Sequence, residues 1–593
     1  MERRVLLAIS LSFLVLFLFQ RFVMPPPAPA SNGSQSASAQ PPTGAASGST
    51  PSQPMSGAVT PGQAQPLSGN PLVPAVAPAP APETTAPPEM LLGETAEREI
   101  VVDTTTVNAV FSNRGARLLR WTLKGYRNEA GEPLELVPSA AGTDAVKPFS
   151  LVVDDTTVTA RLNSSLYRVM VDGAGVTNTI NATSEPRTLT FEMSAADGLT
   201  VLKTFSLEPS GYLITFGSSV QLGQVRLNPT IHWGPGLGDA IAFAPPASFF
   251  SPSYNTPARP IFHVDGSVER ITSGTSGSQE SVFRYAGVND HYFVSVVLNI
   301  DEPVPFRLDY APVRATQAAD PTIVGNYEGY AVRYQTPHDR AQFFFGPKDF
   351  ESLRSIDTEL VRVIDFGIFS WLAVPLLGAL KWVHGFVGNW GWSIVVLTIL
   401  INVALFPLRH KSVVSMRKMQ EIQPQMKAIQ DRYAKYKVTD PERQKMNTEV
   451  MALYKTRGVN PASGCVPMLL TMPFLFAFYS MLSQAIEIRD ASFILWIRDL
   501  AAPDPYFVSP LIMGASMFWQ QKMTPTTADP TQAKIMMFMP IMFTFMSLSF
   551  PSGLVVYWTV SNVFTIGQQY FTNYLIGSPA KPVMPAKPTK PAK

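Results

Sequence analysis

The sequence predicts a polytopic α-helical membrane protein with an N-terminal anchor and a five-helix core, which also carries a large all-β domain and a charged helical hairpin. Apolar runs lie at the N-terminus and beyond about residue 364, and they explain why 46% of the 593 residues are hydrophobic and only 15% are charged. Between these runs, apolar and polar residues alternate with a period of two. The formal net charge of +2 gives no reason to expect DNA as a partner.

The first 23 residues have the features of a signal anchor. Two arginines precede an apolar stretch that is long for the core of a signal peptide and short for a comfortable membrane span. The small residues that a signal peptidase could accept alternate with prolines. We therefore expect an uncleaved transmembrane helix over residues 1–23, with cleavage as the alternative. Residues 24–93 are rich in Pro, Ala and Ser, which predicts a disordered tether.

Residues 94–345 have the alternation of a sheet with one buried face, as in Leu189–Met193, and turn-forming residues separate the runs. This pattern predicts a β-sandwich outside the membrane. We identify no active site in it, because its histidines, His232, His263 and His291, are far apart in sequence. The single cysteine, Cys465, excludes a cysteine-rich metal cluster. Neither a metal nor a cofactor is expected.

Residues 346–388 are predicted to link the β domain to the membrane core. Within them, residues 364–387 are apolar but interrupted by Pro375, Lys381 and His384, and tryptophans lie near both ends of the stretch. This mixture is typical of an amphipathic helix that lies in the membrane interface.

Five membrane-spanning helices are expected after this linker, the first over residues 389–408 and four more within residues 462–575. Several are short: residues 535–550 would cover about 24 Å, less than the roughly 30 Å of the hydrocarbon core, so we expect a thinned bilayer there. Lysines and arginines crowd the segment between the first two spans, which places that segment in the cytoplasm. With the anchor, six spans leave both termini in the cytoplasm, the second as a basic, Pro-rich tail over residues 576–593.

The segment 409–461 is predicted to form a helical hairpin in the cytoplasm. Met419, Ile422 and Met426 recur at three- and four-residue steps, and a second helix begins after Asp440 with a similar stripe. A solvated linker would explain the charges but not the stripes.

Polar residues are aligned within the predicted membrane helices. Residues four apart share a helical face, so Thr398 and Asn402 point the same way. A second stripe in the last span consists of Tyr557, Ser561, Thr565 and Gln568 or Gln569, with Asn562 alongside, and Ser480 with Gln484 forms a smaller patch. Such groups usually hydrogen-bond one another between helices. For the set as a whole a hydrated cleft is favoured, and both interpretations remain open.

Several stretches resemble the YidC-type membrane protein insertases of Gram-negative bacteria. The resemblance covers about residues 364–575 and is carried by NWGWSIVVLTI, ALYKTRGVNP, SGCVPMLLTMPFLFAFYSML, QKMTPTTADPTQAKIMMFMPIMF and FPSGLVVYWTVSN. The anchor, tether and β domain match the layout of that family. The resemblance implies an inner-membrane protein with a periplasmic domain of β-supersandwich type and a polar groove open to the cytoplasm and to lipid.

The resemblance also implies a function and partners. The family inserts and folds newly made membrane proteins, alone or with the Sec translocon, and receives ribosome-bound chains. The implied partners are nascent membrane proteins, the Sec translocon, the ribosome with the signal recognition particle pathway, and membrane lipids. The resemblance implies neither a cofactor nor an enzymatic reaction.

One position departs from the family pattern. The family usually carries an arginine in the first core span, and aligning the motif at residues 389–391 places Asn402 there, while Trp558 stands where a tyrosine is common. We expect Asn402 to hydrate the groove, and Arg409, two helical turns further on, to place a positive charge at the cytoplasmic mouth beside Lys411. Alternatively, Asn402 only ties its helix to Tyr557 or Ser561. The groove residues expected are Thr398, Asn402, Gln484, Tyr557, Trp558, Ser561 and Asn562.

The main alternative function is that of a secondary transporter, because polar stripes and short spans also occur in transporters. Neither an inverted repeat nor a carboxylate at mid-membrane supports it. An intramembrane protease would need a serine with a basic partner at membrane depth, and a sugar-active β domain would rest on fold analogy alone.

Overall fold

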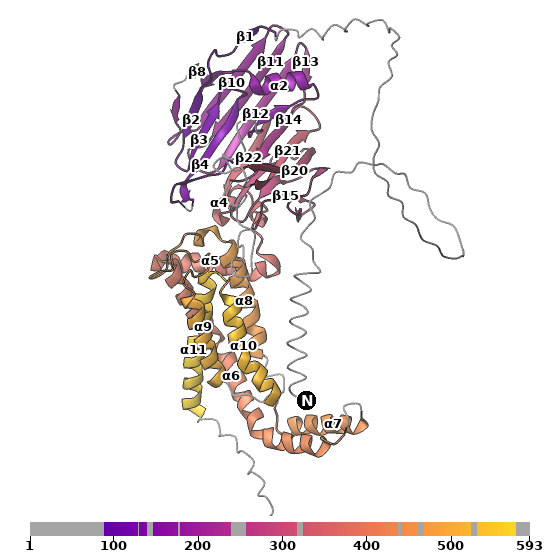
Figure 1. Cartoon of the computed structure of the whole chain (residues 1–593), viewed down its shortest axis with the longest axis vertical. Helices are drawn as coiled ribbons and strands as arrows, with labels where there is room; N and C mark the ends of the chain where they lie inside the picture. The colour runs from indigo at the N-terminus through magenta and orange to yellow at the C-terminus, as the bar shows by residue number, and fades with distance from the viewer. Residues whose placement is uncertain are drawn as a thin grey trace, which may run out of the picture. The chain divides into compact units, whose positions relative to one another are not determined.

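The structure is a computed structural model that describes residues 88–576, apart from residues 129, 139–145, 176–177, 239–255, 317–323, 437–439, 460–465 and 524–529. The expected anchor, nearly all of the expected tether, the tail beyond residue 576 and Cys465 lie outside the described residues. The strands lie between Met90 and Pro347, together with α2 (Thr156–Ser164), and the other helices follow them in the chain (Figure 1).

The β domain contains three sheets, which confirms the large β-rich domain predicted from the alternation. The strand order in the largest is β16 (Ser267–Arg270), β15 (Arg259–Val264), β18 (Tyr285–Asn289), β19 (Phe293–Leu298), β22 (Arg340–Pro347), β12 (Leu213–Leu222), β11 (Leu199–Leu207), β10 (Arg187–Ala195), β7 (Arg168–Val171), β8 (Ala174–Gly175). Two short strands extend this sheet: β1 (Met90–Leu92) pairs with β10, and β13 (Val225–Leu227) pairs with β12.

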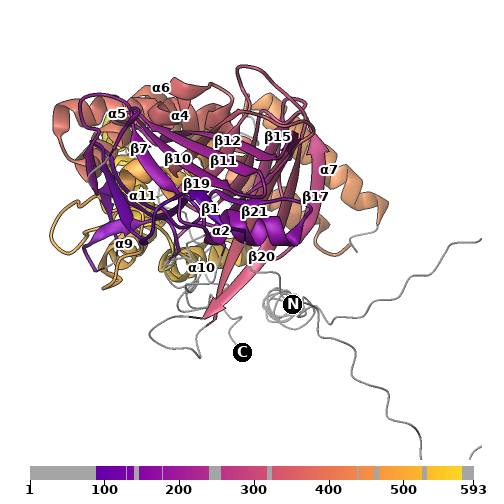
Figure 2. The same ribbon diagram turned by 90° about the horizontal axis from the view of Figure 1, so that it is seen from above.

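The two smaller sheets have five strands each. Their orders are β17 (Gly277–Ser281), β20 (Phe306–Thr316), β21 (Val324–Tyr334), β14 (Thr230–Pro235), β6 (Ser150–Val152), and β5 (Pro133–Glu135), β4 (Arg117–Arg127), β3 (Val107–Ser112), β2 (Glu99–Asp103), β9 (Thr179–Asn181). The strand pairs are antiparallel except for β2 with β9. In Figure 2 the long hairpin of β20 and β21 reaches beyond the neighbouring strands.

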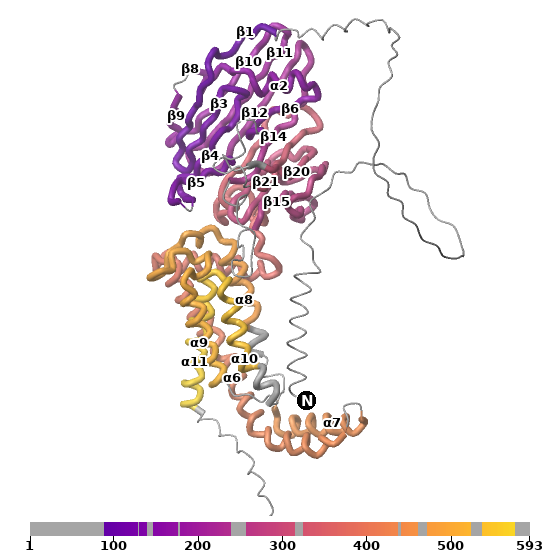
Figure 3. Tube along the Cα trace, in the orientation of Figure 1, coloured from indigo at the N-terminus to yellow at the C-terminus, as the bar shows by residue number. Residues whose placement is uncertain are grey.

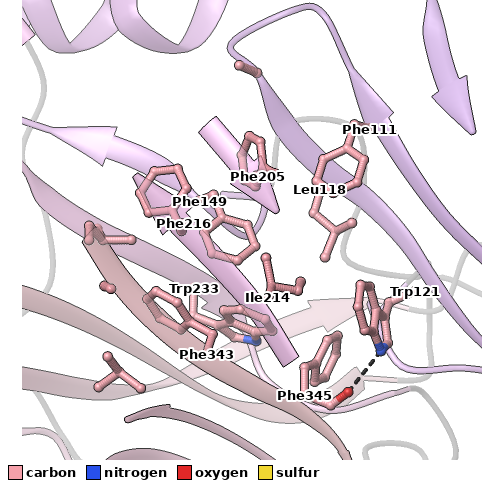
Figure 4. Packing of buried hydrophobic residues seen from close by; sticks show 14 of the residues in the cluster. Phe111, Leu118, Trp121, Phe149, Phe205, Ile214, Phe216, Trp233, Phe343 and Phe345 are labelled. Atoms are coloured by element: carbon pink, nitrogen blue, oxygen red, sulfur yellow. Dashed lines mark hydrogen bonds between the residues drawn. The ribbon is translucent and has the colours of Figure 1, made fainter. Parts of the chain in front are cut away.

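Aromatic side chains fill the interior of the β domain, as Figure 4 shows. The ring of Phe149 lies about 5 Å from those of Phe205, Phe216, Trp233 and Phe343. The indole Nε1 of Trp121 donates a hydrogen bond of 2.9 Å to the carbonyl oxygen of Phe345 on another sheet. The core thus joins strands from separate sheets.

One inward position breaks the alternation that predicts the sheet. Along β11, Leu199, Val201, Phe205 and Leu207 are buried as expected, and Lys203 occupies the inward position between them. Its Nζ donates hydrogen bonds to the carbonyl oxygens of Gly115, Ala116 and Phe149. Burial holds the pKa of Lys203 well below its usual value.

The connector from the β domain to the helices is fastened to the β domain. It contains α4 (Phe350–Ile356), η1 (Leu360–Val363) and η2 (Gly367–Phe369). Arg284 pairs with Asp357, and Arg259 lies 3.2 Å from Asp365. Leu353, Leu360 and Val363 are buried in one cluster with Tyr285, Val294 and Phe344 of the β domain.

Helix α5 (Ser370–Val387) exposes the aromatic residues Trp371, Trp382 and Phe386 and buries Leu377 and Leu380. Among the described residues, two helical segments are long and apolar enough to cross a membrane, Gly367–Val387 and Trp390–Tyr433, and Met536–Ser547 is a shorter apolar helix. Length therefore permits α5 to cross, whereas its exposed aromatic residues agree with an interfacial position.

The remaining helices are α6 (Trp390–Tyr433), α7 (Pro441–Thr456), α8 (Val466–Gln484), η4 (Ile486–Ile488), α9 (Val508–Met523), α10 (Pro530–Ser547) and α11 (Ser552–Ile576). α6 continues without a break through residues 408 and 409, where the sequence suggests a boundary between a membrane span and the hairpin. It contains Pro407 and Pro424. Its second half runs beside α7 (Figures 1 and 3), with Met419, Ile422, Tyr454 and Val459 in contact.

The start of α6 explains part of the motif at residues 389–391. The side chain of Asn389 caps the helix by accepting a 3.0 Å hydrogen bond from the backbone nitrogen of Trp392. Its Nδ2 also donates to the carbonyl oxygen of Ser492 at 3.1 Å. A side chain at Gly391 would overlap the ring of Phe493, since a Cβ there would lie 2.0 Å from it. The motif therefore attaches the loop after α8 to the beginning of α6.

Candidate functional site

Asn402 lies on α6 in contact with α11, and only 2% of its surface is exposed. Its Nδ2 donates to the carbonyl oxygen of Thr398 at 2.8 Å and to Oγ of Ser561 at 3.2 Å. The hydroxyl of Thr398 donates to the carbonyl oxygen of Ile394, within α6. The bond to Ser561 is the contact that the alternative interpretation of Asn402 expects.

The side chain of Arg409 extends back along α6 toward Asn402. Its Nη1 donates to Oδ1 of Asn402 at 2.6 Å and to Oγ1 of Thr565 at 3.1 Å, and its Nη2 donates to Oγ1 of Thr471 at 3.3 Å. Long side chains on a helix point toward its N-terminus, which explains the direction of this reach. The guanidinium of Arg409 thus joins α6, α8 and α11, and Lys411 is exposed.

The polar contacts between α6 and α11 continue along both helices. Gln568 Nε2 lies 3.4 Å from the carbonyl oxygen of Phe406, His410 Nδ1 lies 3.3 Å from Oγ1 of Thr572, and Arg417 contacts Asn573. We call these contacts, with those of Asn402 and Arg409, the polar seam. It consists of Asn402, Phe406, Arg409, His410 and Arg417 on α6 and Ser561, Thr565, Gln568, Thr572 and Asn573 on α11.

The other expected groove residues lie in different surroundings. Tyr557 is buried, with its ring stacked 4.1 Å from that of Phe478 on α8. The ring of Trp558 meets that of Phe543 on α10 edge-on. Asn562 Nδ2 donates to Oγ of Ser516 on α9 at 3.0 Å and so joins a different helix pair. Gln484 is the last residue of α8, more than three helical turns beyond Thr471.

The seam is cationic and, in the described part of the chain, contains no carboxylate. The ion pairs found among the described residues do not include Arg409, and its three hydrogen-bond partners are neutral. The described residues also show no group of His, Cys, Asp or Glu that could hold a metal ion. Hydroxyl and amide groups around a guanidinium can bind a carboxylate or water.

A second polar cluster joins the β domain to the end of α8. His291 accepts at Nδ1 from the backbone nitrogen of Thr256, so its Nε2 donates to the carbonyl oxygen of Ser483 at 2.6 Å. Ser483 is in the last turn of α8, where carbonyl groups lack helical partners. Burial lowers the pKa of His291 to about 4 and raises the pKa of the neighbouring Asp290 to about 6.

Charged residues on the loop after α8 complete this junction. The guanidinium of Arg489 lies over the rings of Tyr292 and Phe293 and donates to the carbonyl oxygen of Arg127 at 3.1 Å. Lys381 of α5 lies 2.6 Å from Glu487. Burial raises the pKa of Glu487 despite this ion pair.

Comparison with known proteins covers both parts of the chain. Residues 99–379 match the family described as the YidC periplasmic domain, and residues 382–578 match the family described as the 60Kd inner membrane protein. A membrane protein insertase YidC from Syntrophus aciditrophicus is 33% identical over 97% of this chain and 99% of its own length. The YidC insertase of Geotalea daltonii is 34% identical over 97% and 99% of the two chains.

The chain belongs to the YidC family of membrane protein insertases. It is accordingly an inner-membrane protein with a β-rich periplasmic domain and a helical C-terminal core, as the resemblance implies. A crystal structure of an active YidC insertase with its first transmembrane domain resolved aligns with 83% of this chain and 95% of its own, at 17% identity and a TM-score of 0.34.

Sequence reasoning missed much of the seam of this YidC relative. The spacing of Asn402, Phe406, Arg409 and His410 continues the face that begins at Thr398, and on α11 residues 561, 565, 568 and 572 do the same. The signal was present, but an expected end of the span at residue 408 separated His410 and Arg417 from it, while Arg409 was expected on this face as a charge at the cytoplasmic mouth.

Proposed function

We propose that this chain inserts and folds newly made membrane proteins by receiving their polar segments at the polar seam between α6 and α11. One observation carries the proposal: Arg409 is 8% exposed, and its guanidinium is held by Asn402, Thr565 and Thr471, all of which are neutral. A buried cation that has no counter-ion among the described residues favours an incoming carboxylate, because the attraction between charges is stronger away from bulk water.

Asn402 has two parts in this proposal. Its amide holds α6 to α11 through Ser561, and its Oδ1 holds the guanidinium of Arg409. When the helices separate, the same groups become available to water or to a passing polar segment, and this forms the groove open to the cytoplasm and lipid. The groove would include Thr398, Tyr557, Ser561 and Trp558, while Asn562 and Gln484 would lie at its margins.

The proposed topology has six spans, both termini in the cytoplasm, α5 in the outer interface and the hairpin of α6 and α7 in the cytoplasm. The lysines and arginines of the hairpin support this orientation. We propose ribosomes delivered by the signal recognition particle pathway, the Sec translocon and membrane lipids as partners, nascent membrane proteins as clients, and no enzymatic reaction. The tether would act as a flexible spacer, and the tail would contact the ribosome weakly.

The test is rescue of a bacterium depleted of its own insertase, with two single-span clients that differ only in an acidic or a neutral translocated tail. The wild-type chain should insert both clients. Arg409→Gln should slow the acidic-tailed client about tenfold or more and leave the neutral one nearly unchanged, because the removed attraction is on the order of 1.4 kcal/mol or larger. Arg409→Lys, which keeps the charge, should lie between the two.

Lys411→Gln provides the matched control, since Lys411 is exposed and close to Arg409 in sequence. It should leave both clients unchanged. Equal slowing of the two clients by Arg409→Gln would contradict recognition of acidic segments, and failure of the well-expressed wild-type chain to rescue growth would contradict the insertase proposal itself.

A further inference from the structure

The loop between α8 and α9 contains two apolar residues in an unusual backbone conformation. Leu495 has φ +55° and Phe507 has φ +57°, in the left-handed region that large L-residues rarely adopt. Yet 77% of Leu495 and 45% of Phe507 are exposed. The chain therefore maintains a strained backbone at two positions where an apolar residue remains largely exposed, in Leu495, or nearly half exposed, in Phe507.

The other residues with positive φ do not share this combination. In the described part of the chain, three of them are aspartates, which tolerate the left-handed region, and Ala116 and Phe149 are fully buried. Phe149 gains the packing of a complete aromatic core in return for its strain. Leu495 and Phe507 gain nothing comparable from the described residues, and a partner outside the chain could supply the apolar surroundings.

Local hydrogen bonds fix both turns. The backbone nitrogen of Ile497 donates to the carbonyl oxygen of Ile494, which places Leu495 at a turn position that usually takes Gly, Asn or Asp. Asp504 is buried and its carboxylate accepts hydrogen bonds from the backbone nitrogens of Tyr506 and Ser509. The exposed side chains are thus held in place by defined turns.

The loop lies at the end of the helical bundle where several helices begin. Asn389, which caps α6, donates to the carbonyl oxygen of Ser492. At the start of α11, Ser552 Oγ donates to the carbonyl oxygen of Ala502, and the backbone nitrogen of Gly553 donates to that of Leu500. α9 begins directly after Phe507 and exposes Leu511 and Ile512 in its first turns. Phe507 therefore adjoins the exposed apolar side of the first turns of α9.

We propose that Leu495 and Phe507 insert into the bilayer interface and anchor this end of the helical bundle to lipid. Apolar side chains in the region between head groups and acyl chains gain the transfer free energy that the turns alone cannot provide. Tyr506, which is 68% exposed between them, has the amphipathic character of an interfacial residue. In the topology of the proposed function this is the periplasmic leaflet, but the insertion itself does not depend on that assignment.

The depth of the loop can be measured with a polarity-sensitive fluorophore. Cys465 is replaced by Ser, and single cysteines are introduced as Leu495→Cys, Phe507→Cys or, as a control, Val225→Cys. Val225 is 62% exposed and apolar but lies on β13 in the β domain. The labelled full-length proteins are placed in nanodiscs of phosphatidylethanolamine and phosphatidylglycerol, with or without lipids brominated near the top of the acyl chains.

Labels at 495 and 507 should emit at shorter wavelength than the label at 225, and brominated lipid should quench them about twofold or more while leaving the control unchanged. A short wavelength without quenching by bromine would mean that protein covers the loop, and quenching by aqueous iodide alone would mean that the loop is in water. Either result overturns the anchor. If one labelled variant fails to fold, the other site decides, and neither outcome depends on insertion of a client.

Discussion

At the scale of single residues, the guanidinium of Arg409 reaches back along α6 to Asn402. The side chain of Arg409 begins seven residues after Asn402, and it ends within 2.6 Å of Oδ1 of Asn402. The side chains of Asn402 and Arg409 together occupy the space between α6, α8 and α11. The sequence alone suggests that Asn402→Arg would be tolerated. The structure predicts the opposite, because two guanidinium groups would then face each other.

We therefore expect Asn402→Arg to impair insertion of clients with acidic tails, and the exchange Asn402→Arg with Arg409→Asn to restore it. The exchange keeps one cation and one amide at the same contact, whereas the single substitution adds a like charge within about 4 Å, which costs on the order of 1–4 kcal/mol. Insertion rates and thermal stability are measured for the wild type, both single variants and the double variant. A double variant no better than Asn402→Arg would refute the shared position.

Asn402→Leu should leave the guanidinium of Arg409 with one partner fewer and α6 without its bond to Ser561. An unpaired buried donor costs roughly 1–3 kcal/mol, so we expect a lower melting temperature together with slower insertion of polar-tailed clients. If insertion recovers completely when the assay temperature is lowered to compensate for the stability loss, Asn402 acts only as a tie between helices.

The four-residue spacing was enough to predict that Asn402 and Ser561 can face one another. It could not predict that Asn562 bonds Ser516, or that Gln484 lies at the end of α8 away from Thr471. Spacing defines the faces of a helix, but rotation of each helix about its axis is decided by packing against its neighbours. The reach of a long side chain such as Arg409 is likewise a property of the assembled helices.

At the scale of elements, α9 and α10 approach each other closely at a glycine. A Cβ at Gly514 would lie 2.0 Å from Oγ1 of Thr544, whereas a Cβ at Gly567 on α11 would meet no atom within 4 Å. Small residues at helix contacts allow close packing in membranes. The closeness of α9 and α10 therefore depends on Gly514.

Gly514→Ala should destabilise the protein by about 1–3 kcal/mol, because the added methyl group overlaps Thr544. Thermal unfolding in detergent or nanodiscs measures the change. Gly567→Ala is the matched control and should be neutral or slightly stabilising. Adding Thr544→Ala should recover part of the loss, and equal behaviour of the two alanine variants would show that α9 and α10 have room to separate.

The hairpin of α6 and α7 has defined contacts. Tyr433 Oη donates to Glu449 at 3.2 Å, and Tyr454 Oη lies 2.9 Å from the sulfur of Met426. Deletion of residues 413–456 should therefore abolish insertion, since it removes a structured surface. Shortening residues 31–85 by half should not, because their composition predicts reach alone. Insertion assays on membranes with equal amounts of each variant test this pair, and equal tolerance of both deletions would count against a specific role of the hairpin.

At the scale of the whole molecule, the β domain and the helices meet at polar groups that the sequence did not indicate. His291 and Arg489 are far apart in the chain, and their partners are the backbone carbonyls of Ser483 and Arg127. Composition and periodicity predicted both parts of the molecule, because each part has its own hydrophobic pattern. Every residue has a backbone carbonyl oxygen, so residue types do not reveal which carbonyls accept these hydrogen bonds. The junction could therefore not be predicted from the sequence.

His291 should stabilise the junction less in acid. The folded state holds His291 neutral with a pKa of about 4, whereas the released side chain takes up a proton below about 6.5, so stability is lost as the pH falls from 6.5 toward 4. Near pH 5 the loss through His291 alone is about 2 kcal/mol. Asp290, with its pKa raised to about 6, acts in the opposite direction over part of this range.

Comparison with His291→Gln isolates the contribution of the histidine. Thermal unfolding is followed for the wild type, His291→Gln and the control His338→Gln. The measurements run from about pH 7.5 to about pH 4.5, which covers most of the range over which His291 should change the stability. The wild type should lose stability relative to His291→Gln on acidification, and His338→Gln should follow the wild type. If the stability of all three proteins depended on pH in the same way, a buried neutral His291 would be excluded.

Pro407 lies between Asn402 and Arg409 and weakens α6 at the place that their contact spans. Pro407 has no backbone N–H for the carbonyl of Val403, so the helical ladder of α6 has a gap there. The hydrogen bond from Arg409 to Asn402 joins residues on either side of that gap and reinforces α6 there. Under the proposed function, a client carboxylate that pairs with the guanidinium would take this hydrogen bond away, and we then expect α6 to bend more easily between the bundle and the hairpin. Occupancy of the seam would in this way be coupled to the flexibility of the helix that leads to α7.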